Sequence, residues 1–144
     1  MKTPKGANTT LNLIYNSLLY WNPSQKNLKV ICDNCSGQNK NNLTLWFYSW
    51  LTIIRWFDTI ELNFMIPGHT KFICDSGFGT IKSLYRKSNV MSMNHIKVIV
   101  NQSKKDRSNI AVRYDGKNQV GWNYYDFEIL LKPYFVKYNS MRSY

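Results

Sequence analysis

Apolar residues recur at helical spacing along much of the 144-residue chain, and this pattern predicts five helices. The first begins near Thr9 or Thr10, either of which could act as its N-cap, and ends at Asn22-Pro23. The other four are expected at about residues 42–57, 76–87, 93–102 and 127–134.

The second predicted helix is unusually apolar, which changes what we expect of its surroundings. Asn41 or Asn42 could cap it, and apolar residues extend well beyond one half of its surface. Such a helix should be largely buried or should face a partner. We interpret its aromatic residues, from Trp46 to Phe57, as core rather than as a platform for stacking bases.

Two apolar stretches between these helices predict strands. Leu28–Cys32 indicates a short buried strand, and residues 59–66 indicate a second. With the helix between them they would form a β-α-β unit, in which two parallel strands are joined by a right-handed crossover. Farther on, Ile110–Tyr114 and Gln119–Trp122 flank Asp115-Gly116, a pattern typical of a hairpin. Because parallel sheets are normally covered on both faces, either this hairpin completes the sheet or strands are missing from the start.

Charge adds the first indication of function. Nineteen Lys and Arg against eight Asp and Glu give a net charge of +11. Residues 1–72 carry seven basic and three acidic residues and residues 73–144 carry twelve and five, so the excess is spread along the chain. A polyanionic partner, most simply nucleic acid, would fit this charge, although a general bias toward Lys and Asn would also produce it.

Other features of the sequence exclude several classes of protein. No apolar run approaches the roughly 18 residues that a membrane span needs, and the N-terminal residues lead into no signal-peptide core. We therefore expect neither membrane insertion nor secretion. Three cysteines make no disulfide framework, which fits a reducing compartment.

Asp33 is the strongest candidate for chemistry. It directly follows the first predicted strand, where α/β sheets place functional groups. The loop behind it is rich in amides that could bind phosphate oxygens or base edges. Those side chains are Asn34, Gln38, Asn39, Asn41 and Asn42, with Lys40 among them. Ordinary turn chemistry explains the same composition equally well.

His69 and Asp75 follow the second predicted strand. A parallel neighbour would bring them to the same sheet end as Asp33, where two carboxylates and an imidazole could hold Mg²⁺ or Mn²⁺. Such a metal could activate water and stabilise a leaving oxygen in phosphodiester cleavage. The alternatives are that Asp75 caps a helix and that His69 is a hydrogen-bonded structural residue.

Two competing site motifs are weaker. Cys32-x-x-Cys35 with His69 and Cys74 has ligand types that suit Zn²⁺, but strand alternation turns Cys32 away from Asp33, so zinc is not favoured. The stretch Ser76–Lys82 suggests a phosphate-binding loop but lacks its spacing, so a plain helix N-terminus is preferred.

Basic residues gather in two places. Lys82, Arg86 and Lys87 are spaced so that one helix face could track phosphates, and a second cluster follows in a loop. That loop cluster is Lys104, Lys105 and Arg107. A solvated helix face is the alternative to a phosphate-binding one, and His95 is interpreted as a residue on a helix surface.

Several motifs resemble a transposon-derived eukaryotic family that is similar to DDE-type transposases and integrases with a ribonuclease-H-like fold. The run Asp33-Asn34-Cys35-Ser36-Gly37-Gln38-Asn39-Lys40-Asn41 is the most specific of them. The second motif is Gly68-His69-Thr70-Lys71-Phe72 with Asp75, Phe78-Gly79 and Lys82, and its Gly-His-Thr and Asp part is moderately specific. Ala111–Tyr114 and Tyr125–Phe127 also match. The resemblance covers roughly residues 10–136.

The resemblance implies an incomplete α/β ribonuclease-H-like core at residues 10–88, followed by a C-terminal extension at 89–138. Asp33 would be the second catalytic acid and Asp75, with His69 beside it, the third, the two carboxylates holding Mg²⁺ or Mn²⁺. The first acid has no counterpart, so the chain is expected to be the C-terminal part of a DNA-cleaving domain and inactive alone. The strand that normally pairs with the first strand here would also be missing, so that edge could mediate self-association.

The resemblance further implies DNA as the partner and a nuclear location. The expected DNA contacts are Asn34, Gln38, Asn39, Lys40, Lys71, Lys82, Arg86 and Lys87. The alternative function is a non-catalytic, basic nucleic-acid-binding module, whose binding would be independent of metal and sensitive to salt. A zinc-stabilised interaction domain is a third and weaker reading.

Overall fold

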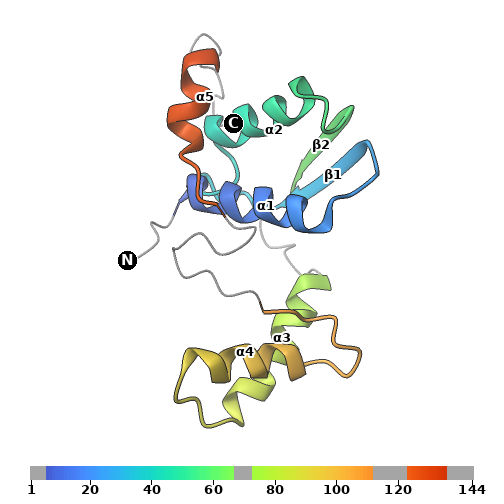
Figure 1. The fold of residues 1–144 in the computed structure, drawn as a ribbon, viewed down its shortest axis with the longest axis vertical. Coiled ribbons are helices and arrows are strands. Elements are labelled where there is room, and N and C mark those ends of the chain that lie inside the picture. The colour runs from blue at the N-terminus through green and yellow to red at the C-terminus, as the bar shows by residue number, and fades with distance from the viewer. Residues whose placement is uncertain (1–5, 67–72, 112–122, 136–144) are drawn as a thin grey trace. The chain divides into compact units, whose positions relative to one another are not determined.

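A computed structural model describes residues 6–66, 73–111 and 123–135 of the chain (Figure 1). The chain forms two compact units, which we call the α/β unit (residues 1–70 and 116–144) and the helical unit (residues 71–115). The described elements are α1 (Ala7–Trp21), β1 (Asn27–Cys32), α2 (Asn42–Ile53), β2 (Thr59–Phe64), α3 (Ile73–Arg86), α4 (Met93–Gln102) and α5 (Phe127–Phe135). The mixed α/β class is thereby confirmed, while the division into residues 10–88 and 89–138 stays a prediction.

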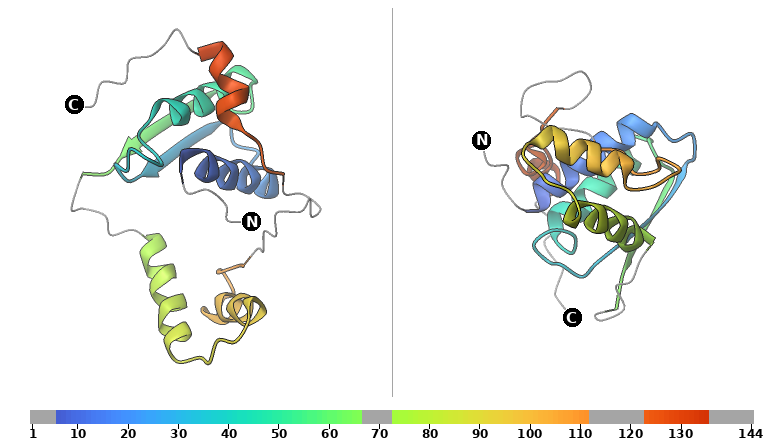
Figure 2. Two further views of the ribbon diagram at one scale, coloured as in Figure 1. Left: turned by 90° about the vertical axis from the view of Figure 1, so that its left-hand side faces the viewer. Right: turned by 90° about the horizontal axis from the view of Figure 1, so that it is seen from below.

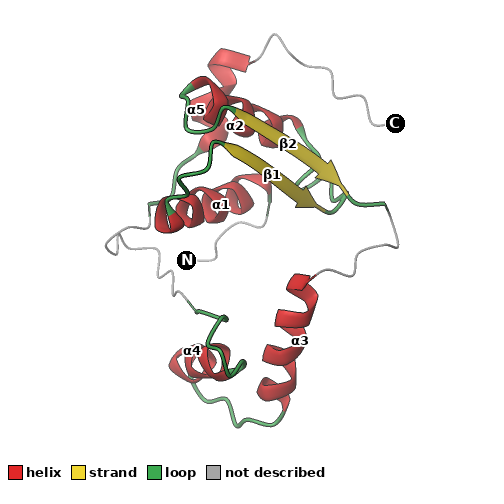
Figure 3. Ribbon diagram, turned by 90° about the vertical axis from the view of Figure 1, so that its right-hand side faces the viewer, coloured by secondary structure: helices red, strands yellow, loops and turns green. Residues whose placement is uncertain are grey.

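The two strands pair in parallel, as the β-α-β pattern predicted. Their register runs from Asn27 opposite Thr59 to Cys32 opposite Phe64, with α2 as the connection. Figures 2 and 3 view the α/β unit from opposite sides, and α1 and α2 lie on the same face of the sheet in both. The expected hairpin falls mostly on residues 112–122, outside the described part of the chain.

The expectation that β1 is buried is wrong for half of its residues. Side chains alternate along the strand, so Leu28 and Val30 pack against the core while Ile31 is 46% exposed. The outer face is polar, and on it the Lys29 Nζ lies 3.4 Å from a Glu61 carboxylate oxygen. Among the described residues, no second layer covers this face of the sheet.

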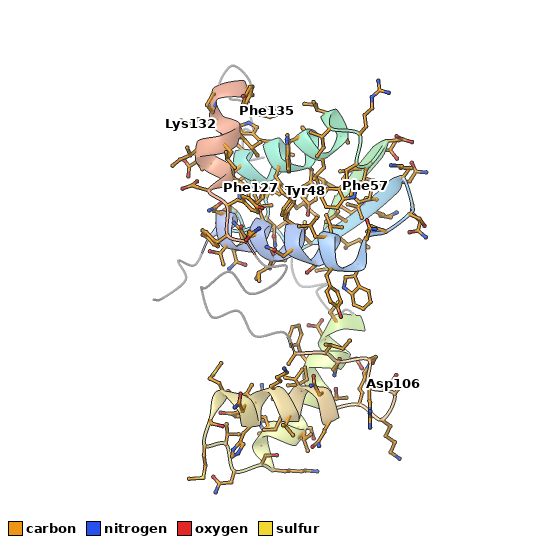
Figure 4. All side chains as sticks on the ribbon, in the orientation of Figure 1. Tyr48, Phe57, Asp106, Phe127, Lys132 and Phe135 are labelled. Atoms are coloured by element: carbon orange, nitrogen blue, oxygen red, sulfur yellow. The ribbon has the colours of Figure 1, made fainter. Side chains whose placement is uncertain are left out.

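The core of the α/β unit forms where α2 packs on the sheet, on α1 and on α5. Among the described residues its fully or nearly fully buried apolar members are Leu11, Phe47, Tyr48, Leu51, Phe57, Phe127 and Leu131. Figure 4 labels Tyr48, Phe57 and Phe127 among them. Within α2 only Ser49 and Ile53 are exposed, which confirms the predicted burial of this helix. Trp46 and Trp50 pack against the same cluster, so the aromatic residues are core, as expected.

A ladder of asparagines joins α1 to the backbone of residues 123–127. Asn12 Nδ2 donates to the Tyr125 carbonyl at 2.7 Å, and its Oδ1 accepts from the Tyr125 N–H at 2.7 Å. Asn16 makes the same pair of bonds to Asn123. Asn8 bonds the Tyr125 carbonyl and the Phe127 N–H. Because the three side chains are spaced at i, i+4 and i+8, one helix face binds an extended segment as a neighbouring strand would.

Three helix boundaries differ from the prediction. The first helix starts at Ala7, so Thr9 and Thr10 lie inside its first turn, where Thr10 Oγ1 bonds the Gly6 carbonyl. The second ends four residues early, because Arg55 takes a positive φ of 57°. The third starts at Ile73, before the expected caps. The sequence predicts helix ends from local propensity, whereas in the folded chain each end also depends on hydrogen bonds and on backbone geometry.

The helical unit has a much smaller core. α3 packs against α4, and among the described residues of this unit Ile99 is the one buried side chain. Asn109 Nδ2 lies between the hydroxyls of Ser103, at 2.7 Å, and Thr80, at 3.3 Å. α4 spans the predicted residues and is capped by Ser92, whose hydroxyl accepts from the His95 N–H; the His95 side chain is exposed, as expected.

Candidate functional site

Asp33 lies where β1 ends, with an exposed side chain. Its Oδ1 accepts two hydrogen bonds, from the Cys35 N–H at 3.0 Å and from Asn39 Nδ2 at 2.7 Å. The Cys35 carbonyl then accepts from the N–H of Asn39 at 2.7 Å and of Lys40 at 3.0 Å. The carboxylate therefore holds the loop through Oδ1, and neither of these two hydrogen bonds uses Oδ2.

The Asp33 loop is tied to the end of β2. Asn34 Nδ2 donates to the Met65 carbonyl, and the Met65 N–H donates to the Cys32 carbonyl at 2.9 Å. Lys40 Nζ lies 5.8 Å from the centre of the Phe64 ring. The structure thus brings Asp33, Asn34, Asn39 and Lys40 to the carboxyl ends of the two parallel strands.

Of two further loop residues predicted to contact DNA or to cap α2, one uses its side-chain amide in the fold and the other uses only its backbone. Asn41 caps α2, since its Oδ1 accepts from the Thr44 N–H at 2.9 Å, and its Nδ2 donates to the Ser36 carbonyl. The Gln38 carbonyl accepts from Thr44 Oγ1 at 3.2 Å, while the Gln38 side chain is exposed. The turn chemistry that was the alternative for this loop is therefore present beside the exposed carboxylate.

The predicted convergence of Asp33, His69 and Asp75 is not tested. His69 and Lys71 lie outside the described residues, and Asp75 lies in the first turn of α3, in the other unit. Within residues 6–66, 73–111 and 123–135, no group of three His, Cys, Asp or Glu could hold a metal ion. The assignment of these residues to one metal site stays a prediction.

The cysteines occupy different environments. Cys32 faces the core, where burial and then the charge of Asp33 raise its pKa. Cys35 and Cys74 are exposed, on the Asp33 loop and on α3. Strand alternation does turn Cys32 away from Asp33, as expected.

The outward face of α3 combines two basic side chains with two aromatic rings, and the exposed Asp75 lies on the same side in the first turn. Lys82 and Arg86 are exposed one turn apart, and Phe78 and Tyr85 are 68% and 48% exposed on the same side. The partly buried residues of α3 are Gly77, Thr80, Ile81 and Leu84, and Asn109 lies beside Gly77 and bonds Thr80. We call Phe78, Lys82, Tyr85 and Arg86 the α3 face. The sequence analysis found its charges but did not place the two rings beside them, because spacing alone does not show which side of a helix is exposed.

Lys87 does not share the α3 face. The helix ends at Arg86, and Lys87 follows it in a turn. Even in a continuous helix, a spacing of i+5 turns Lys87 about 140° away from Lys82, so the prediction of one face for all three is wrong. Lys87 remains exposed beside the helix end.

The loop after α4 adds further positive charge to the helical unit. Lys105 and Arg107 are exposed and Lys104 is half-buried. The acidic residue among them, Asp106, is turned to its own backbone, and the hydrogen bond from the Ser108 N–H lowers its pKa. Residues 73–111 contain seven basic and two acidic residues, a net charge of +5.

A groove that the sequence did not predict lies between α2 and α5. Its volume is about 1010 Å³, and its lining is mostly aromatic and aliphatic. The residues that define it best are Trp46, Trp50, Ile53, Leu130, Tyr134 and Phe135. None of the predicted site residues lines it.

Among the described helices, none is long and apolar enough to cross a membrane.

Comparison with known proteins gives a family and no activity. The chain belongs to the family described as a domain of unknown function, DUF7869, whose model matches residues 1–144. No curated protein and no solved structure matches the chain significantly.

Proposed function

We propose that this member of the DUF7869 family binds nucleic acid through the α3 face. The observation that carries the proposal is that Lys82 and Arg86 are exposed one helical turn apart on the same side of α3. Lys29 and Glu61, in the α/β unit, form an ion pair. Among the described residues no such pair involves Lys82 or Arg86, so neither charge is neutralised in this way. Both are available to phosphates.

The charge around the α3 face favours a polyanion. Residues 73–111 carry a net charge of +5, and Lys105 and Arg107 add exposed basic groups. A polyphosphate releases counterions when such groups neutralise it, and this release drives binding that weakens steeply with salt. A solvated helix face, the alternative, would show no such binding.

Charge removal from the α3 face tests this function. The variant Lys82→Gln with Arg86→Gln should bind a fluorescent 20-nucleotide DNA about tenfold more weakly in an anisotropy titration. The slope of log K against log salt should fall by about two, since each phosphate contact contributes a little less than one.

The control removes two charges from the α/β unit, through Lys29→Gln with Lys132→Gln. Both side chains are exposed, and the net charge changes by the same amount. We expect nearly unchanged affinity. Equal losses in both variants would indicate nonspecific attraction, and an unchanged Lys82/Arg86 variant would refute the α3 face as the binding surface.

Asp33 supports a second candidate, a divalent-metal-dependent activity on DNA in a domain derived from a transposase or integrase with a ribonuclease-H-like fold. The observation behind it is that an exposed carboxylate stands at the carboxyl end of a parallel strand, with its loop bonds on one oxygen. Asp33 and Asp75 would hold Mg²⁺ or Mn²⁺, with His69 beside them. The metal would activate water for phosphodiester cleavage. A nuclear location belongs to the same proposal.

Mn²⁺ titration distinguishes this candidate from ordinary turn chemistry. Asp33→Asn keeps the oxygen that accepts from Cys35 and Asn39 but removes the charge. We expect it to lose Mn²⁺ binding, measured by calorimetry, while Asp58→Asn, at an exposed aspartate elsewhere in the α/β unit, retains it. Equal binding by Asp33→Asn and the parent would rule out Asp33 as a ligand.

A further inference from the structure

We propose that the α3 face prefers single-stranded nucleic acid to a duplex, because its exposed rings stack on unpaired bases. The inference rests on the proposed nucleic-acid binding and adds the class of ligand. It concerns Phe78 and Tyr85, which contribute no charge and are not explained by phosphate contact.

The two rings and the two charges form one stripe along α3. Positions 78, 82, 85 and 86 are spaced at i, i+4, i+7 and i+8, so they lie on one side of the helix. Three partly buried residues of α3, namely Gly77, Thr80 and Leu84, lie on the other side of the helix. Phe78 is 68% exposed and Tyr85 48%, so each presents ring surface to solvent.

Neither ring contributes to the core of the helical unit. Ile99 is the buried residue among those described there, and no stacking partner is recorded for Phe78 or Tyr85 among the described rings. The rings alternate with the cations along the stripe, so each ring stands beside a group that can contact phosphate.

The spacing of the rings suits successive parts of one strand. Seven helical residues separate them by about 10 Å along the axis, at roughly 1.5 Å per residue. Stacked bases rise by about 3.4 Å, so the two rings would meet different bases of the same strand. Lys82 and Arg86 fall within the same stretch and can contact the phosphates that join those bases.

Strand selectivity follows from what each form of nucleic acid exposes. In a duplex the faces of the bases are stacked on one another, and a ring on a helix surface can reach them only by forcing a step open. In a single strand the faces are accessible, and stacking on an aromatic side chain strengthens binding with little dependence on sequence. Phosphate contacts alone would not distinguish the two forms in this way.

The test compares one 20-nucleotide DNA as a single strand and as a duplex, by anisotropy with the full chain at fixed salt. We expect the single strand to bind at least tenfold more tightly. Phe78→Leu and Tyr85→Leu, which keep an apolar side chain but remove the ring, should each weaken single-strand binding about tenfold and change duplex binding less than twofold. Tyr85→Phe keeps the ring and should bind like the parent.

Tyr134→Leu is the matched control, because Tyr134 is a 79% exposed ring in the other unit. Equal affinity for the two DNA forms, or unchanged binding by both leucine variants, would overturn the strand preference. If salt-dependent binding then still required Lys82 and Arg86, the proposed function would stand. Absence of binding to either form would overturn both.

Discussion

At the scale of single residues, the most consequential feature is the asparagine ladder of α1. Asn12 and Asn16 are buried polar side chains, and each gives and accepts a bond with the backbone of a segment more than one hundred residues later. A buried amide is tolerated only when such bonds satisfy it. The ladder therefore fixes where the C-terminal segment enters the core.

Asn12→Ala should destabilise the α/β unit by about 1–3 kcal/mol, because it leaves the Tyr125 N–H without its partner and leaves the Tyr125 carbonyl with the bond from Asn8 alone. Chemical denaturation measures the change. Asn94→Ala makes the same substitution at an exposed position of α4 and should change the free energy of unfolding by less than about 0.5 kcal/mol. A similar effect at the two positions would show that the ladder is not stabilising.

The burial of Tyr48 predicts how the stability of the chain responds to alkaline pH. Burial, and then the charge of Cys32, raise the pKa of Tyr48 above its ordinary value of 10.0. The unfolded chain therefore loses this proton first as the pH rises. The stabilisation that comes from the neutral Tyr48 hydroxyl in the folded chain is complete below pH 10 and is lost as the pH rises above it.

Tyr48→Phe should flatten the fall of the unfolding free energy above pH 10, by up to about 1.4 kcal/mol per pH unit. Urea denaturation at a series of alkaline pH values measures the slope. Tyr134→Phe, at an exposed ring, controls for the loss of one tyrosine. Parallel slopes for Tyr48→Phe and the parent would contradict the argument.

At the scale of elements, α2 links the candidate site to the core. Its N-cap, Asn41, belongs to the Asp33 loop, and its next residues carry the buried Thr44 and Phe47. The loop is consequently anchored at three places: on Asp33, on β2 through Asn34, and on the first turn of α2.

Asn41→Ala should cost about 1 kcal/mol or slightly more, since it removes the cap of α2 and the bond to the Ser36 carbonyl. Thermal or urea denaturation measures the loss. Asn42→Ala, one residue later and inside the helix, provides the comparison and should be nearly neutral. If both variants had the same stability, the cap would not be what positions this helix start.

At the scale of the whole molecule, the two units differ in how much apolar surface they bury. The α/β unit has a cluster of seven buried apolar residues, whereas the described part of the helical unit has Ile99. Burial of apolar surface is the main source of stability, so the helical unit should open more readily. Self-association through the open edge expected at β1 stays a prediction. A measurement of the oligomeric state of the chain in solution would test it.

Hydrogen exchange should show this difference directly. Backbone amides of α3 and α4 should exchange at least about tenfold faster than those of α2, because opening costs less where less is buried. Mass spectrometry of peptides from each helix measures the rates. Equal protection in the two units would indicate one cooperative structure.

The sequence determined the elements and part of the site. Local periodicity was sufficient for the seven described helices and strands, and the β-α-β pattern for the parallel pairing and the position of Asp33 at the strand end. These features depend on neighbouring residues, whose spacing is visible in the chain itself.

Only the tertiary structure decided the features that join distant residues. The ladder from Asn12 to Tyr125, the exposed outer face of β1 and the apolar groove between α2 and α5 depend on which elements pack together. Likewise, Phe78 and Tyr85 could be distinguished from core residues only by their exposure in the folded chain. Periodicity shows that a helix has two faces, but burial by another element decides which face meets water.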